Sequence, residues 1–259
     1  MRGRRAFRLF IPGRLNENKV NTTGRSEGKF MTTFLLIHGA YQGGWIWKLI
    51  AQRLQAQGHT VYAPSLDGCG ERAHQLRAGI TTETHADEII KFISYHDLHD
   101  VIVVGTSSGG MVMARMAELA PERFQRLVFA DALMLMDGEK IRDIVTQPAA
   151  INTALALGPD KEDAEGRLLV GLEPDMRGWA AERFTLHPQA VFNQPVKLER
   201  FWDMPWRASV LYCSGAADPG EKHLRRGAEK LGATWHKIDT GHYPMLSTPD
   251  ELLSVILAE

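Results

Sequence analysis

The stretch VVGTSSGG at residues 103–110 decides how the rest of the chain is interpreted. Its apolar start is typical of a buried strand, and the pattern Gly-x-Ser-x-Gly then leads into residues that can open a helix. A serine at such a turn projects its hydroxyl above the sheet, and small flanking residues avoid clashes there. The helix start adds N–H groups and a positive dipole end beside the serine. The pattern predicts that Ser107 is a nucleophile.

Two other interpretations of the same turn are a helix N-cap at Ser107 and a loop that cradles a phosphate. A phosphate loop requires G-x-x-x-x-G-K-[ST], and a dinucleotide loop requires G-x-G-x-x-G. Residues 103–110 contain neither pattern. The nucleophile is therefore the favoured interpretation.

Apolar runs of strand length alternate with amphipathic helical patterns on both sides of this turn. Strands are expected at residues 34–37, 60–63, 101–104, 127–130, 209–213 and 234–238. Continuous apolar runs of this kind suit strands that are covered on both faces. The repetition predicts an α/β fold with a mostly parallel sheet and helices on both faces.

The alternation stops between residues 133 and 206, where helical patterns mix with many prolines and aromatic residues. A segment of about seventy-five residues is too long for a structureless loop. It is therefore expected to be an inserted helical cap, and residues 31–132 and 207–259 are expected to form the core.

The first thirty residues differ in composition from the rest, with eight basic and two acidic residues. Their apolar run at residues 7–11 is too short for a secretory signal and is interrupted by Arg8. Residues 1–30 are therefore expected to be a disordered extension, with Met31 opening the folded domain.

The composition limits the class of protein and its partners. Of 259 residues, 30 are Lys or Arg and 31 are Asp or Glu, so no overall positive field would hold nucleic acid. No window is apolar and long enough for a membrane helix. With only Cys69 and Cys213, a reducing cytoplasm fits best, although one disulfide is left open. We expect a cytoplasmic protein without nucleic-acid or membrane partners, and the sequence is compatible with a homodimer.

A serine nucleophile needs a base and a carboxylate that orients the base. On this type of sheet the chain order is Ser, Asp, His. His242 lies in a turn-rich loop after the last expected strand and is the predicted base. Asp218 and Asp131 each follow a strand and both have the right order. Asp218 is preferred because only one helix and one strand separate it from His242.

The site also needs an oxyanion hole and a surface for the substrate. The backbone N–H groups of Ser108 and Ala40 are the expected donors, because Gly39 lets the loop HGAYQGGW at residues 38–45 approach closely. His38 is expected to brace that loop. Neither a metal nor an organic cofactor is expected. The expected substrate contacts are aromatic: Tyr41, Trp179, Phe184, Phe192 and Trp202.

The motifs, taken in order, resemble the α/β-hydrolase superfamily and, within it, the group that holds plant methyl esterases, hydroxynitrile lyases and bacterial esterases. They are HGA and GGW at 38–45, YAPSL at 62–66, GER at 70–72, GTSSGGM at 105–111 and GH at 241–242. The resemblance covers about residues 33–259. It implies a triad of Ser107, Asp218 and His242, an oxyanion hole at Ala40 and Ser108, and a cap at 133–206.

Several positions depart from the pattern of that group. The commoner turn has His before the nucleophile and a large residue after it, where this chain has Thr106 and Ser108. The plant lyases carry Thr after the first His and Lys after the catalytic His, where this chain has Gly39 and Tyr243. That Lys would steady a cyanide leaving group, so its absence favours hydrolysis.

The resulting hypothesis is a serine carboxylesterase that cleaves small, apolar or aromatic carboxylic esters through an acyl-enzyme on Ser107. A carbamate or amide hydrolase with the same triad, a lyase similar to hydroxynitrile lyases, and a non-catalytic ligand-binding protein are the alternatives. Haloalkane dehalogenases and epoxide hydrolases are disfavoured because they use a carboxylate where Ser107 stands.

Overall fold

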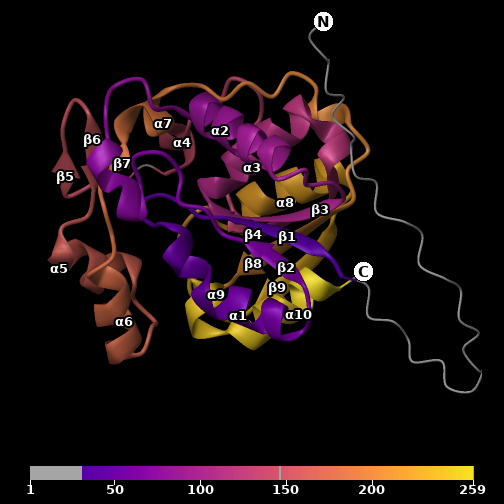
Figure 1. Ribbon diagram of the computed structural model, residues 1–259. Coiled ribbons are helices and arrows are strands. Elements are labelled where there is room, and N and C mark those ends of the chain that lie inside the picture. Colours follow the sequence, from indigo (N-terminus) through magenta and orange to yellow (C-terminus); the bar gives the residue numbers. More distant parts are fainter. Residues whose placement is uncertain (1–30, 146, 259) are drawn as a thin grey trace, which may run out of the picture. The chain divides into compact units, whose positions relative to one another are not determined.

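A six-stranded parallel sheet forms the centre of the computed structural model, which describes residues 31–145 and 147–258 (Figure 1). The strand order is β2-β1-β3-β4-β8-β9, and every pairing is parallel. The strands are β1 (Thr33–Ile37), β2 (Thr60–Tyr62), β3 (Val101–Ser107), β4 (Phe124–Ala132), β8 (Ala208–Cys213) and β9 (Thr234–Ile238). The predicted strands and the α/β fold are confirmed. The expected disordered extension, residues 1–30, lies outside the described residues.

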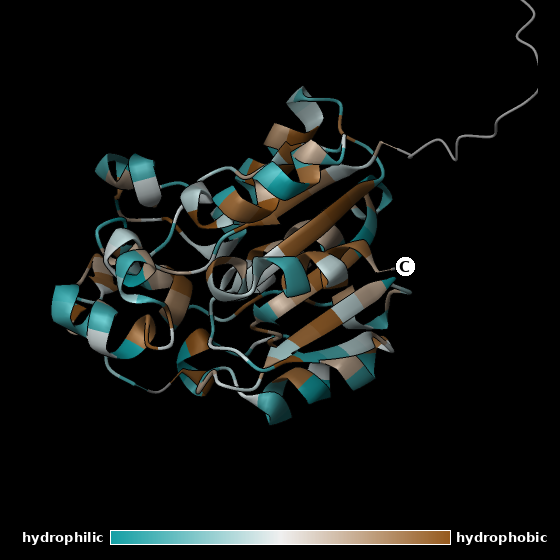
Figure 2. Cartoon of the chain, turned by 90° about the horizontal axis from the view of Figure 1, so that it is seen from below, coloured by the Kyte–Doolittle hydropathy of each residue, from teal (hydrophilic) through white to brown (hydrophobic). Residues whose placement is uncertain are grey.

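Helices cover both faces of the sheet. Side chains of β1 alternate between the two layers: Leu35 and Ile37 pack with one face's helices, and Phe34 and Leu36 with the other's. The first layer holds α2 (Thr82–Tyr95), α3 (Gly109–Leu119) and α8 (Glu221–Leu231). The second holds α1 (Lys48–Ala56), α9 (Pro244–Ser247) and α10 (Pro249–Leu257). Figure 1 shows the two sets on opposite sides of the strands, and Figure 2 shows the apolar residues gathered between them.

The ends of the core helices follow from local chemistry. Thr81 caps α2 with its side chain, which accepts a hydrogen bond from the N–H of Thr84, while the Thr84 hydroxyl accepts one from Thr81. α3 ends before Pro121, which opens the short 3-10 helix η3 (Pro121–Arg123). Gly232 closes α8 with φ 59°, a left-handed conformation that favours glycine. Two more 3-10 helices, η1 (Gly44–Trp47) and η2 (Gly70–Gln75), lie in the loops after β1 and β2.

The segment between β4 and β8, which the sequence leads us to expect as a helical cap, contains short helices and also a small antiparallel sheet. Its helical elements are α4 (Ile141–Ile144), α5 (Lys161–Asp163), η4 (Ala164–Leu168), α6 (Pro174–Ala181), α7 (Gln189–Asn193) and η5 (Phe201–Asp203). The sheet has the order β5-β6-β7, from Ile151–Asn152, Ala156–Gly158 and His187–Pro188. Strands of two or three residues are too short to give an alternating pattern, so sequence analysis missed them.

Both cysteines, Cys69 and Cys213, are buried and free, so the disulfide that the sequence left open is not formed. Burial raises the pKa of the Cys69 thiol to about 12. Within residues 31–145 and 147–258, no helix combines the length and the apolar character needed to cross a bilayer.

Candidate active site

Ser107 stands at the turn between β3 and α3, as the sequence predicted. Its φ of 50° is left-handed, a strained conformation for a residue with a side chain. The turn leaves no room for larger neighbours: a Cβ on Gly109 would lie 2.5 Å from the carbonyl oxygen of His38, and one on Gly110 equally close to that of Leu133. The small residues around Ser107 are therefore a steric requirement of the turn.

His242, in the loop between β9 and α9, is held by Asp131 at the end of β4. The Nδ1 atom of His242 lies 2.6 Å from Oδ2 of Asp131. The other carboxylate oxygen, Oδ1, accepts a hydrogen bond of 3.1 Å from the backbone N–H of Cys213. Asp131 is fully buried and, like Ser107, has a φ of 50°. With Nδ1 engaged, the second nitrogen of His242 is the one available to a neighbouring hydroxyl.

The predicted pairing of Asp218 with His242 is wrong, because Asp131 occupies the Nδ1 side of the ring. The preference for Asp218 rested on spacing along the chain. In the sheet, β4 lies beside β3, which carries Ser107, so the end of β4 is nearer to the nucleophile than the end of β8. Asp218 lies five residues beyond the end of β8 and lines the cavity instead.

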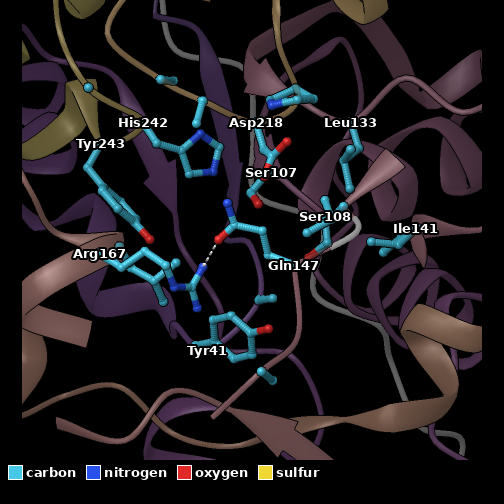
Figure 3. Close-up of a pocket in the computed structure, with 18 of the residues that line it drawn as sticks. Tyr41, Ser107, Ser108, Leu133, Ile141, Gln147, Arg167, Asp218, His242 and Tyr243 are labelled. Atoms are coloured by element: carbon cyan, nitrogen blue, oxygen red, sulfur yellow. Dashed lines mark hydrogen bonds between the residues drawn. The ribbon is translucent and has the colours of Figure 1, made fainter. Parts of the chain in front are cut away.

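A cavity of about 430 Å³ has the candidate nucleophile and the candidate base in its wall. Ser107 and His242 both line it, and Figure 3 shows the His242 ring and the Ser107 hydroxyl facing the same space. Of the other residues predicted for the site, those that also line the cavity are Ala40, Tyr41, Ser108, Phe192 and Asp218.

Three of the five predicted aromatic substrate contacts do not line the cavity. Trp179 packs edge-on against Trp45, with ring centroids 5.2 Å apart. Phe184 contacts Trp45 and Tyr41 from outside the cavity wall. Trp202 is buried against Phe201. Aromatic residues of this segment mainly fill the space against the core, as is common for aromatic side chains with such spacing.

The cavity wall includes cap residues that sequence analysis did not single out. Apolar positions come from Ile141 and Val145, and charged or amide groups come from Arg142, Gln147 and Arg167. Polar residues in short helices and loops look like solvated positions in a sequence, so no signal marked them.

The loop after β1, which carries the proposed oxyanion donor Ala40, is fixed by hydrogen bonds. The N–H of Gly39 donates to Oε1 of Gln42 at 3.0 Å. His38 is buried; its Nε2 accepts from the N–H of Leu66 at 3.0 Å, and its Nδ1 lies 2.8 Å from the carbonyl oxygen of Gly39. The prediction that His38 braces this loop is confirmed.

We expect Gly39→Ala to lower kcat about 100-fold, because a Cβ on Gly39 would lie 2.5 Å from Cβ of Ser107 and must displace one of the two segments. Steady-state kinetics on a p-nitrophenyl ester measures this. Gly178→Ala is the matched control, since a Cβ at this position in α6 has no heavy atom within 4 Å. Equal kcat values for the two variants would contradict the expectation.

We also expect the free energy of unfolding to fall as the pH drops below about 6.5. Burial lowers the pKa of His38 from 6.5 to about 4, so in this interval the unfolded chain binds a proton that the folded protein does not. One pKa unit corresponds to about 1.4 kcal/mol, which gives roughly 2 kcal/mol for His38 between pH 6.5 and 5.

Urea unfolding at pH 7 and pH 5 checks this dependence. His38→Gln is expected to have a smaller loss of stability on acidification than the wild type, because the titrating group is gone. His99→Gln, at an exposed position, serves as the control. An identical pH dependence in wild type and His38→Gln would count against the assignment.

The sequence pattern of the alpha/beta hydrolase family matches residues 34–255. The chain belongs to this family, and the fold and the Ser107 turn agree with that assignment. Within the described part of the chain, no group of three or more His, Cys, Asp or Glu side chains could hold a metal ion.

Curated relatives include a carbendazim hydrolyzing esterase from Nocardioides sp. (strain SG-4G), 28% identical over 88% of this chain and 99% of the relative. An alpha-hydroxynitrile lyase from Arabidopsis thaliana is 33% identical, but over only 39% of this chain and 40% of its own length. Among solved structures, an extracellular alpha/beta-hydrolase from a Paenibacillus species has a TM-score of 0.74 at 21% identity, covering 87% of this chain and 98% of the other. The last likeness supports the fold.

Proposed function

We propose that the protein is a serine carboxylesterase in which Ser107 attacks the ester carbonyl carbon. His242 takes the hydroxyl proton and returns it to the leaving alkoxide, and Asp131 holds the imidazole in position. The N–H groups of Ala40 and Ser108 stabilise the oxyanion of the tetrahedral intermediate. Water, activated by His242, then hydrolyses the acyl-enzyme and releases the acid.

The observation that carries this proposal is the 2.6 Å contact between His242 and Asp131 at the edge of the cavity that Ser107 lines. A base that is oriented by a buried carboxylate and shares a cavity with a serine at a strained turn is the arrangement that acyl transfer requires. Membership of the alpha/beta hydrolase family and the esterase names of relatives support an ester-cleaving hydrolase.

The cavity supports small esters with an apolar acyl or alcohol group. Leu133, Ile141 and Val145 give it aliphatic surface, and Phe192 adds one aromatic ring. A volume of about 430 Å³ lies at the lower end of the range for small-molecule sites. The buried free cysteines are compatible with the cytoplasmic location that we propose.

A series of p-nitrophenyl esters with increasing acyl chain length, together with a fluorophosphonate probe, tests the proposal. We expect turnover that declines once the acyl chain outgrows the cavity, and mass spectrometry should locate the probe on the peptide that contains Ser107. A folded protein that neither turns over any ester nor takes up the probe would overturn the proposal.

A further inference from the structure

Asp218 has a place in the cavity but no role in orienting the base. Both oxygens of Asp131 are engaged, one by His242 and one by the N–H of Cys213, so the imidazole needs no second carboxylate. Asp218 lines the same cavity from the loop between β8 and α8. Figure 3 draws Asp218 together with Ser107 and Arg167 among the residues that line this cavity.

The carboxylate of Asp218 is half-buried and has no hydrogen bond or ion pair with any described residue. A carboxylate that has lost part of its water without gaining a partner is poised to accept one. Hydrogen bonds from a charged donor are the strongest partners available to it.

The positive groups of the cavity wall are engaged elsewhere. Arg167 forms two hydrogen bonds to Asp163, of 2.5 and 2.6 Å, and one of 3.4 Å to Oε1 of Gln147. The guanidinium of Arg142 lies over the ring of Phe192 at 5.4 Å and reaches the carbonyl of Gln147 at 3.5 Å. Both arginines come from the cap, whereas Asp218 comes from the core. Among the arginines and the aspartate that line the cavity, the charge without a protein partner is therefore the negative one of Asp218.

We propose that Asp218 is a specificity-determining residue that binds a protonated amine or another cationic nitrogen on the substrate, so that the enzyme favours esters of amino alcohols over neutral esters of the same shape. This inference rests on the proposed esterase function. The reaction at the carbonyl is unchanged, and Asp218 contributes attraction for the alcohol group only.

The test compares two esters of equal size, 2-(dimethylamino)ethyl butanoate and 3-methylbutyl butanoate, at a pH where the amine is protonated. Titration of the released acid gives kcat/KM for each. For the wild type we expect a ratio of about 10 in favour of the cationic ester, the size typical of one charge-assisted contact at a partly exposed site. Asp218→Asn is expected to bring the ratio close to one, and Asp218→Glu to recover part of it.

Asp203→Asn is the matched control, because Asp203 is exposed and does not line the cavity, and its ratio should equal that of the wild type. A wild-type ratio of one or less, or a ratio that Asp218→Asn leaves unchanged, would overturn the inference. An equal and severe loss on both esters in Asp218→Asn would also overturn it, since Asp218 would then act on the base. If the wild type cleaves neither these esters nor the p-nitrophenyl series, the esterase proposal itself has failed.

Discussion

Ser107→Ala is expected to lower kcat for p-nitrophenyl ester hydrolysis about a million-fold, to the level that binding and the oxyanion donors alone can sustain. The neighbouring hydroxyl of Ser108 cannot replace it, because Ser107 stands at the strained turn with φ 50° while Ser108 is the N-cap of α3 with φ −60°. Burst-phase kinetics and the fluorophosphonate probe measure the same loss independently.

A stability measurement and a control variant show whether the loss of activity comes from the missing hydroxyl. The variant should unfold at nearly the same urea concentration as the wild type or a slightly higher one, since alanine removes only a hydroxyl from a strained position. Ser108→Ala is the control, because it keeps the backbone N–H that we assign to the oxyanion hole. If Ser107→Ala retained labelling or more than a thousandth of the wild-type kcat, Ser107 would not be the nucleophile.

Asp131→Asn is expected to lower kcat about 10,000-fold on a neutral ester with little change in KM. An amide at this position can keep the contact with Nδ1 of His242, but it favours the wrong tautomer and cannot stabilise the imidazolium. The 2.6 Å contact with a fully buried carboxylate is the reason to expect so large an effect. Steady-state kinetics at several pH values provides the measurement.

The comparison with Asp218→Asn separates the two carboxylates. On the same neutral ester that variant should lose at most a few-fold in kcat, because Asp218 has no hydrogen bond or ion pair with His242 or with any other described residue. Circular dichroism should report folded protein for both variants. A reversed order of the two effects would return Asp218 to the role that chain spacing suggested.

The sequence predicted the sheet and the turn that carries Ser107 because both depend on local signals. Strand β3 is a continuous apolar run, and the turn at Ser107 needs small residues within three positions on either side. The place of His242 in the cavity wall could be predicted for a similar reason, since the loop after β9 returns to the same edge of the sheet. Such features are determined by neighbouring residues and can be predicted without knowledge of tertiary contacts.

The orienting acid could not be decided in this way. Asp131 and Asp218 both follow a strand in the required order, and the choice depends on which carboxylate reaches Nδ1 across the sheet. That is a property of strand order, β3-β4-β8-β9, which chain spacing does not encode. The prediction of the residues that line the cavity failed for another reason. Trp179 and Phe184 were expected in the cavity, but aromatic residues equally suit the packing between cap and core.

The hydrogen bond from Cys213 to Asp131 comes from the main chain, and this determines how the site can tolerate change. The amide that anchors the acid is present whatever side chain position 213 carries, provided that it is not proline. The position of the Asp131 carboxylate thus depends on the alignment of β4 with β8 and not on the side chain at position 213. Position 213 is consequently a place where the interior can be redesigned while the contact between Asp131 and His242 stays intact.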